Sequence, residues 1–305
     1  MFQRSRGRGG QQIFLALLLC SAAGCDRHPA TASPAPTAHT RPTVVSLVPA
    51  ATDLILGMGA GDHLAGVSNW DAARPEIANL PRVGDYRTVD WEKIAQVHPG
   101  VMIVQFAPDK MPPGLSQRAA QLGAKLVNVK INRLDDVFET IGVLGGALDE
   151  SSKAQEAARQ LRAQLDNVRA RVAGKSPVRT LISRSESALA VVGGGNFMDD
   201  LLTLAGGKNV IESGDNSYPT IDRERLMALD PDVVLHLLPG ASPQEIDQAK
   251  SFWPTMSQVS AVKNNRVYVL TDSYLLLPGY SVGKIAELFA SRLHPQPTES
   301  SKERS

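Results

Sequence analysis

One long segment without glycine or proline divides the chain. Residues 149–172 repeat Ala, Leu and Val at helical spacing and carry many charged side chains. This pattern predicts one continuous helix, about 35 Å long at 1.5 Å per residue, with one face in solvent. Gly174 and Pro177 end it. Every other part of the fold therefore lies either before or after one rigid helix.

Apolar, β-branched runs alternate with helical patterns on both sides of this helix, and such runs predict buried strands. The expected strands are residues 44–48, 64–67, 101–104, 125–129, 178–183, 188–192, 233–236 and 267–270. The expected helices between them are residues 52–58, 114–122, 133–148, 197–205 and 282–293. Strands that alternate with helices in this way predict parallel sheets with helices on both faces.

The predicted fold class is α/β, with two lobes that contain mainly parallel sheets and are bridged by one long rigid helix. We expect the N-terminal lobe over residues 44–148, the bridging helix over 149–173 and the C-terminal lobe over 174–295. A chain of 305 residues, 43% of them hydrophobic, is long and apolar enough for two such lobes. The spacing of about 130 residues between the lobes is too long for a solenoid repeat.

The N-terminus has the pattern of an export signal. Three arginines precede an apolar run at residues 13–20, which is too short for a membrane span, and small residues follow at 21–24. We therefore expect a signal peptide over residues 1–24. The tetrapeptide A-A-G-C resembles a bacterial lipoprotein box, which implies that Cys25 is lipidated and anchors the exported chain to a membrane, facing the periplasm or the cell exterior. Plain cleavage, with release of a soluble secreted protein, is the alternative.

Cysteine content and charge limit the remaining possibilities. The chain has only two cysteines, Cys20 and Cys25, so no disulfide framework is available to an exported body that must rely on its core. Residues 25–43 are rich in Pro, Ala and Thr and are expected to form a tether, while 296–305 form a disordered polar tail. A formal net charge of +1 excludes a strong nucleic-acid footprint.

One phrase occurs twice in the chain. Residues 86–104 and residues 218–236 share Tyr, Thr, Asp, Glu and Pro at the same spacings. The shared aspartates, Asp90 and Asp222, are placed to cap the N-termini of two short helices, and a proline ends each helix before an apolar strand. The phrase therefore predicts the same helix and strand once in each lobe.

The shared glutamates and tyrosines each allow a structural and a functional interpretation. Glu92 and Glu224 fall in the first turns of the two helices, where a carboxylate interacts favourably with the helix dipole. Their equivalent places in two lobes also suit a partner that touches both lobes. Tyr86 and Tyr218 precede the helices on loops, where they either pack locally or contact a ligand.

Several stretches together carry a family resemblance. They are V-S-L-V-P-A-A-T-D-L-I-L-G-M-G-A-G-D-H-L-A-G-V-S, W-E-K-I-A-Q-V-H-P-G-V-M-I-V, L-L-T-L-A-G-G-K-N-V-I, R-E-R-L-M-A-L-D-P-D-V-V-L and L-P-G-Y-S-V-G-K-I-A-E-L. In this order they resemble the periplasmic substrate-binding proteins of iron-chelate and cobalamin ABC importers, over about residues 44–295. The resemblance implies two α/β lobes, a ligand in the cleft between them, and limited hinge motion around the bridging helix.

The resemblance also implies site residues. By it, Glu92 and Glu224 dock onto arginines of the membrane permease, and charge-assisted pairs of this kind fix orientation. Matching the cobalamin-binding members position by position implies ligand contacts at Trp70, Tyr86, Phe106, Tyr218, Asp272 and Tyr274. Aromatic walls suit a large planar macrocycle. Cobalamin or another corrinoid is thus the favoured ligand, and haem and ferric siderophores are the alternatives.

The implied protein is a monomer without a cofactor of its own, and its partners are a permease dimer with its ATPase and the metal chelate that it delivers. Two other functions are alternatives to chelate import. Divalent-metal binding needs about three or four converging His and carboxylate ligands, but the six histidines are scattered along the chain. A sensor or adhesion lipoprotein with the same fold is the other alternative. An enzyme is not expected, because a phosphate loop and a dinucleotide fingerprint are missing, and no cysteine is left as a nucleophile once Cys20 is removed with the signal and Cys25 is lipidated.

Overall fold

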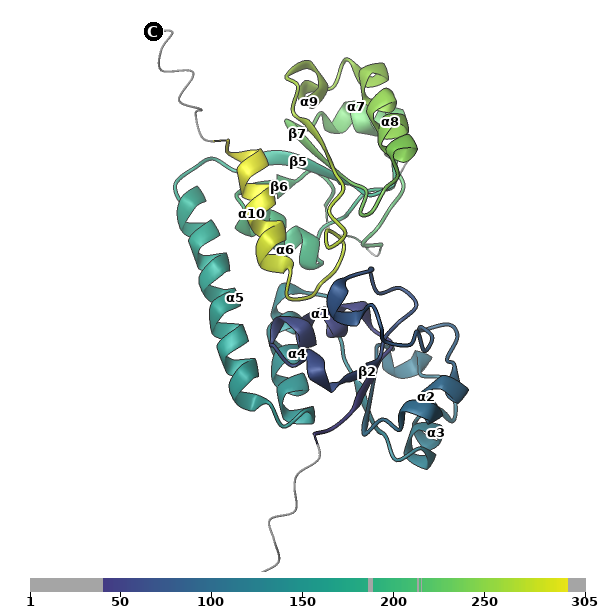
Figure 1. Cartoon of the computed structure of the whole chain (residues 1–305). Helices are drawn as coiled ribbons and strands as arrows, with labels where there is room; N and C mark the ends of the chain where they lie inside the picture. Colours follow the sequence, from purple (N-terminus) through teal and green to yellow (C-terminus); the bar gives the residue numbers. More distant parts are fainter. Residues whose placement is uncertain (1–40, 186–188, 213, 215, 296–305) are drawn as a thin grey trace, which may run out of the picture. The chain divides into compact units, whose positions relative to one another are not determined.

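The computed structural model describes residues 41–185, 189–212, 214 and 216–295 (Figure 1). The predicted signal peptide, Cys25, nearly all of the predicted tether and the predicted tail therefore lie outside the described residues. Within the described part of the chain, no helix combines the length and apolar character that a membrane span requires.

The described residues before the long helix contain one four-stranded parallel sheet in the order β2-β1-β3-β4. Its strands are β1 (Val44–Ser46), β2 (Leu64–Gly66), β3 (Val101–Val104) and β4 (Lys125–Asn128). Its helices are α1 (Pro49–Gly57), α2 (Trp91–Val97), α3 (Leu115–Gln121) and α4 (Leu134–Ala147). Val45 pairs with Met102 of β3, which in turn pairs with Leu126 of β4.

The described residues after the long helix repeat this arrangement in the order β6-β5-β7-β8, again all parallel. The strands are β5 (Val178–Ser183), β6 (Gly207–Asn209), β7 (Val233–Leu237) and β8 (Val267–Leu270). The helices are α6 (Phe197–Leu204), α7 (Arg223–Leu229), α8 (Pro243–Phe252), α9 (Ser260–Lys263) and α10 (Val282–Leu293). Short 3₁₀ turns are Gly61–His63, Pro75–Ile77, Pro108–Lys110 and Trp253–Met256.

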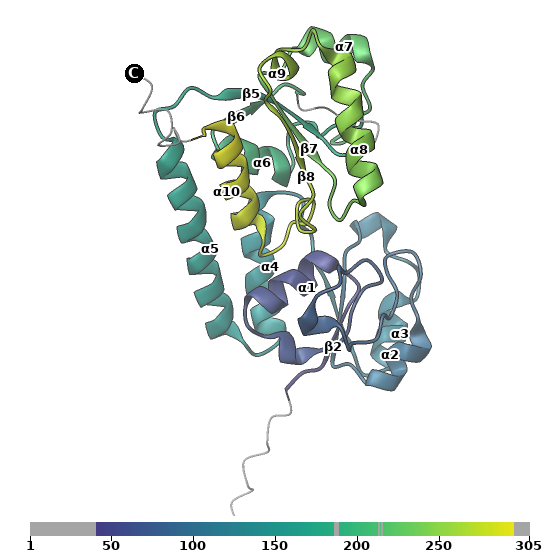
Figure 2. The ribbon, with the colours of Figure 1, turned by 45° about the horizontal axis from the view of Figure 1, so that its top comes forward.

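Alternate strand residues face two different helical layers. Along β7, Val233 and Leu235 join the apolar cluster that contains α6 and α10, while Val234 between them joins a second cluster with Trp253 and Met256. Figure 2 shows α6 and α10 on one side of this sheet and α7 and α8 on the other. Because side chains alternate along a strand, both faces of the sheet need an apolar cover. The structure thus confirms the predicted α/β class with two lobes.

The bridging helix is α5 (Ser151–Val172), and it packs closely against one helix from each lobe. A Cβ on Gly145 of α4 would lie 2.4 Å from the Cβ of Ala154, and a Cβ on Gly283 of α10 would lie 3.2 Å from Leu161 Cδ1. Gly145 therefore permits an approach of α4 to α5 that a larger residue would prevent, whereas at Gly283 the nearest atom, Oε1 of Gln164, ends a flexible side chain that can move aside.

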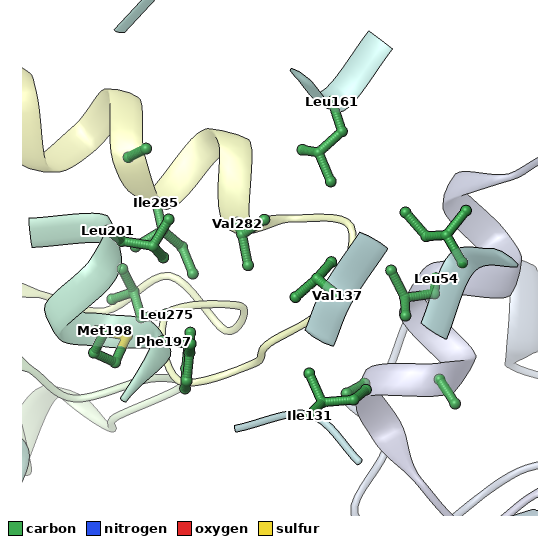
Figure 3. Close-up of a cluster of buried hydrophobic side chains, with 14 of the residues drawn as sticks. Leu54, Ile131, Val137, Leu161, Phe197, Met198, Leu201, Leu275, Val282 and Ile285 are labelled. Carbon is green, nitrogen blue, oxygen red and sulfur yellow. The ribbon is translucent and has the colours of Figure 1, made fainter. Parts of the chain in front are cut away.

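One apolar cluster is continuous from the first lobe to the second (Figure 3). Leu54 of α1 and Val137 of α4 lie in it together with Leu161 of the bridging helix, and Phe197 and Ile285 belong to it from the C-terminal lobe. All five side chains are buried. Because a large movement between the lobes would expose this shared apolar surface to water, the cluster opposes wide opening.

Three sequence-based expectations were wrong in detail. Helix α1 begins at Pro49 rather than Thr52, because the fixed φ of proline suits the first helical position and Val48 is extended before it. Residues 188–192 do not form a strand; the described part makes only isolated bridges, Ser183 to Val191 and Ala190 to Thr220. Strand β6 was not expected, because its short Gly-Lys-Asn sequence carries no strand pattern.

Candidate functional site

The carboxyl ends of both parallel sheets border one cavity of about 590 Å³. Ligands of open α/β sheets bind outside the carboxyl ends of the strands, and the volume lies within the range of about 300–1,000 Å³ found for small-molecule sites. The lining residues come from segments that follow β1, β3, β4 and β8 and from those that precede α6 and α7. They are Val48, Pro49, Ala50, Gln105, Ile131, Asn132, Gly195, Asn196, Phe197, Ser217, Tyr218, Leu276, Leu277 and Pro278.

The two lobes are joined beside this cavity. The backbone N–H of Phe197 donates to the carbonyl of Asn132 at 2.8 Å. Arg133 donates through Nε to Asp200 at 2.8 Å and through Nη2 to the same carboxylate, and Asp200 also accepts from the backbone N–H of Leu134 at 3.0 Å. The hydrogen bond and charge of Asp200 raise the pKa of Arg133 above its ordinary value. Polar contacts thus fasten the start of α4 to the start of α6.

Tyr218 lines the cavity from the C-terminal lobe and is 40% exposed. The guanidinium carbon of Arg184 lies 4.8 Å from the centre of its ring, which is the geometry of a cation–π contact. Burial raises the pKa of the Tyr218 hydroxyl, and the charge of Arg184 acts in the opposite direction. Tyr218 therefore offers an aromatic face and a neutral hydroxyl to the cavity.

A second hollow of about 550 Å³ adjoins this cavity within the C-terminal lobe. It is lined by Arg184, Ser185, Leu237, Leu238, Pro239, Gly240, Ala241, Glu245 and Leu276. Leu276 borders both hollows, and the stacked pair of Arg184 and Tyr218 connects one to the other. A ligand larger than the first cavity has room to extend into the second.

Tyr86 and Phe106 come together in a third hollow of about 390 Å³ that belongs to the N-terminal lobe. The carboxamide of Asn128 holds Phe106 by accepting from its backbone N–H at 2.9 Å and donating to its carbonyl at 3.0 Å. Asp85 holds the Tyr86 loop by accepting from the backbone N–H groups of the two residues that follow Tyr86, which lowers the pKa of this carboxyl. Trp91 lines the same hollow beneath the guanidinium of Arg118.

The other three predicted ligand contacts line none of these three hollows. Trp70 is 65% exposed, on a loop where Asp71 accepts from the backbone N–H of Ser68 at 2.8 Å. Tyr274 packs on the main core below Lys284, and burial, with the nearby charge of Asp272, raises the pKa of its hydroxyl. Of the six predicted contacts, the structure places one in the cavity between the sheets and two together in the N-terminal lobe.

Sequence reasoning missed Arg184 as a residue of the site. A signal was available, because an arginine directly after a buried parallel strand lies at the carboxyl edge of its sheet. Asn132 and Asn196 were missed for another reason. They reach the cavity through contacts between helices far apart in the chain, which no local pattern encodes.

The repeated phrase folds as predicted at its helix starts. The carboxylate of Asp90 accepts from the backbone N–H of Lys93 at 3.1 Å, and that of Asp222 accepts from Arg225 at 2.7 Å. The hydrogen bond from Lys93 lowers the pKa of Asp90. Each helix ends in a left-handed residue before its proline, namely His98 in α2 and Asp230 in α7. Glu92 and Glu224 are exposed in the first turns, as expected, and their role as docking residues stays a prediction.

Among the described residues there is no group of three or more His, Cys, Asp and Glu side chains placed to hold a metal ion. His236 is buried in β7 and uses both ring nitrogens in hydrogen bonds within the lobe, with the backbone carbonyl of Ser185 and the indole of Trp253. The described part of the site is therefore built from aromatic, apolar, amide and arginine side chains.

The sequence and the fold are both similar to those of known proteins. The periplasmic binding protein family matches residues 44–274. A vitamin B12-binding protein of Vibrio cholerae serotype O1 is 26% identical over 235 residues, which cover 77% of this chain and 83% of that protein. The crystal structure of the periplasmic vitamin B12-binding protein BtuF of Vibrio cholerae superposes with a TM-score of 0.70 at 25% identity, covering 83% of this chain and 96% of that one. The periplasmic haem-binding protein HutB of Vibrio cholerae shares the fold, with a TM-score of 0.72 at 21% identity over 84% of this chain and 100% of that one.

Proposed function

The chain belongs to the periplasmic binding protein family, and from this premise we propose that it is the substrate-binding lipoprotein of an ABC importer for a large metal chelate. As a member of this family it is a binding component of transport rather than an enzyme. We favour cobalamin or another corrinoid as the ligand, because relatives named as vitamin B12-binding proteins match most of the chain.

The cavity between the two sheets is the observation that supports this function most. Both lobes line it, and its walls combine the apolar Leu276 and Phe197 with the aromatic ring of Tyr218. A macrocycle with a broad apolar face buries much surface against such walls. The adjoining hollow at Arg184 gives the side groups of a large ligand a place to extend.

We assign the remaining predicted contacts to the rim of the same site. Tyr86 and Phe106 form an aromatic surface on the N-terminal lobe. Trp70, Asp272 and Tyr274 complete the contacts once the ligand is bound. Because hinge motion is opposed by the shared core, the rim residues require only small loop movements to meet the ligand.

Delivery requires export and docking. We propose that residues 1–24 are removed as a signal peptide, that Cys25 carries the lipid anchor, and that residues 25–43 tether a monomeric two-lobed body to the membrane. The lobes span 44–148 and 174–295 around the bridging helix. Glu92 and Glu224, one exposed on each lobe, then pair with arginines of a permease dimer that is coupled to its ATPase, and two separated ion pairs set the orientation.

A ligand titration tests the proposed binding. The mature protein is titrated with cyanocobalamin, haemin and a ferric siderophore while the fluorescence of Trp70 and Trp91 is followed. We expect saturable quenching by cyanocobalamin. Tyr218→Ala should weaken it about fivefold, since the loss of an aromatic contact costs about 1 kcal/mol, and Met227→Ala, on the outer side of α7, should not. Binding of Zn²⁺ with no response to any of the three chelates would contradict the proposal.

Haem is the second candidate, and one observation favours it. Tyr218 lines the cavity, and tyrosine is a residue type that serves as an axial ligand of haem iron. If haemin binds more tightly than cyanocobalamin, Tyr218→Phe separates ligation from packing, because it keeps the ring and removes the oxygen. Loss of the tyrosinate absorption features in this variant, with haemin still bound, would identify haem as the ligand.

Docking is tested separately from binding. Glu92→Arg and Glu224→Arg reverse the charges of two exposed residues that line none of the three hollows. We expect ligand affinity to be retained and uptake by cells to be lost. Glu139→Arg, another exposed reversal on α4, is the matched control and should leave uptake intact. Normal uptake in the double reversal would favour a sensor or adhesion lipoprotein instead.

A further inference from the structure

Arg184 is held at the centre of the C-terminal edge of its sheet. It directly follows β5, an inner strand that pairs with both β6 and β7. Its backbone N–H donates to the carbonyl of Ala190 at 2.9 Å. The next carbonyl, that of Ser185, accepts from Nε2 of His236 at 2.7 Å. The backbone on either side of Arg184 is therefore fixed, which limits where its side chain points.

Two hydrogen bonds determine the orientation and the tautomer of His236. Trp253 Nε1 carries a hydrogen and only donates, so His236 Nδ1, 3.1 Å away, accepts. Nε2 then carries the ring hydrogen and donates to Ser185. Both His236 and Trp253 are buried. A chain of two directed hydrogen bonds thus runs from the interior of the lobe to the residue beside Arg184.

The guanidinium of Arg184 is not paired with a carboxylate among the described residues. Its Nε is buried and lacks a hydrogen-bond partner there, and its guanidinium lies over the ring of Tyr218 in a cation–π contact. Glu245, which lines the same hollow, accepts hydrogen bonds from both the backbone N–H and the hydroxyl of Ser242 at 2.6 Å, in the capping box of α8. A buried donor without an acceptor costs free energy, so its presence needs a reason.

Elsewhere the chain supplies acceptors to its part-buried arginines. Arg74 pairs with Asp53 at 2.7 Å, and Arg82 donates to two backbone carbonyls at 2.8 and 2.9 Å. Arg266 donates to the carbonyl of Leu293 at 2.7 Å. Arg184 differs from these three because it lines the hollow that adjoins the cavity between the sheets. The missing acceptor is therefore expected to arrive with the ligand.

We propose that Arg184 is the specificity-determining residue that receives an anionic group, a carboxylate or a phosphate, carried on the side of a macrocyclic metal chelate. A guanidinium recognises either group through paired N–H donors, and here it is already oriented by its stack on Tyr218. This proposal rests on the proposed function, and it adds that the site selects for charge at the ligand's edge as well as for an apolar face.

Two ligand pairs provide the test, because each pair differs in its anionic group. Cyanocobalamin carries a phosphodiester that dicyanocobinamide lacks, and haemin carries two carboxylates that are neutral in its dimethyl ester. Affinities of all four probes are measured by fluorescence titration for the wild type, Arg184→Gln and Arg184→Lys. Arg292→Gln is the matched control, since Arg292 stacks on Tyr268 in the same way but outside the hollows. Circular dichroism and thermal melting establish that each variant folds.

In the pair that binds, we expect Arg184→Gln to weaken binding of the member that carries the anionic group by about 10- to 100-fold, since hydrogen bonds to charged groups are the stronger class. Binding of the member that lacks this group should change less than about twofold. The affinity of Arg184→Lys should lie between those of the wild type and Arg184→Gln, because lysine keeps the charge and loses the paired donors. Equal losses for both members, or no loss, would overturn the role of Arg184 while the proposed function stands. Failure of the wild type to bind any of the four probes would overturn both.

Discussion

The indole N–H of Trp253 donates to Nδ1 of His236 across 3.1 Å, and this contact holds the buried imidazole in its neutral form. Protonation of Nδ1 would place two hydrogens against each other. Burial lowers the pKa of His236 below its ordinary value, and the hydrogen bond to Ser185 acts in the opposite direction. The stability of the fold therefore depends on pH through the protonation of His236.

The first prediction concerns acid stability. The unfolded chain binds a proton on this histidine below a pH of about 6.5, while the folded chain resists it. Stability contributed by His236 is thus present above that pH and is lost as the pH falls toward the lowered folded-state pKa. Urea unfolding at pH 7.5 and 5.5 should show a smaller loss on acidification for His236→Gln than for the wild type.

The exposed His98 provides the control for this measurement. It lies in the left-handed region at the end of α2, so His98→Asn keeps a residue that tolerates this backbone conformation. This variant should lose as much stability on acidification as the wild type. An unchanged acid response in His236→Gln would show that other groups cause the loss.

The second prediction compares two glycines of α4. A Cβ at Gly145 would lie 2.4 Å from the Cβ of Ala154, whereas a Cβ at Gly142 meets nothing within 4 Å. Gly142→Ala should raise the free energy of unfolding by about 0.5–1 kcal/mol through helix propensity. Gly145→Ala should lower it by about 1–3 kcal/mol, because α4 must move away from α5. Equal effects in chemical denaturation would show that α4 and α5 are not in close contact.

The order of these elements was predictable, because it depends on local patterns. The bridging helix, the two capped helices and most strands follow from spacing, capping residues and prolines within a few positions of each other. The predicted start of helix α1 at residue 52 was three residues late, because Pro49 is already the first helical residue.

The site was less predictable, because it depends on contacts between distant segments. Tyr218 was identified from the repeated phrase, yet its partner Arg184 comes from a different strand end and Leu276 from a third segment. Tyr86 and Phe106 were expected beside Tyr218, and the structure gathers them in a hollow of their own. The conformations of the loops that follow the strands decide which aromatic residues line the same hollow. No periodicity in the sequence predicts those conformations.

The third prediction concerns a buried carboxylate that ties α1 to the segment before α10. Asp53 pairs with Arg74 at 2.7 Å and accepts from the backbone N–H of Ser281 at 3.0 Å. Asp53→Ala should lower the free energy of unfolding by about 3 kcal/mol, because it leaves a part-buried guanidinium without its partner. Asp62→Ala, which breaks an exposed pair with Arg41, should change it by less than about 1 kcal/mol. Similar losses in the two variants would mean that Asp53 is effectively solvated.

The fourth prediction concerns the contact between lobes made by Arg133 and Asp200. Asp200 accepts from the backbone N–H of Leu134 as well as from the guanidinium, so its removal costs more than removal of Arg133. Arg133→Ala should lower the free energy of unfolding by less than about 1 kcal/mol, since most of this side chain is in solvent. Asp200→Ala should lower it by about 1–2 kcal/mol more.

A double-mutant cycle makes this prediction quantitative. If the two side chains interact directly, the double variant should be more stable than the sum of the single losses implies, by a few tenths of a kcal/mol. Raising the salt concentration should reduce that coupling, because the pair is near the surface. Additive losses at low salt would show that Asp200 acts only through Leu134, as an acceptor at the start of α4, and that the guanidinium contributes nothing to holding the lobes together.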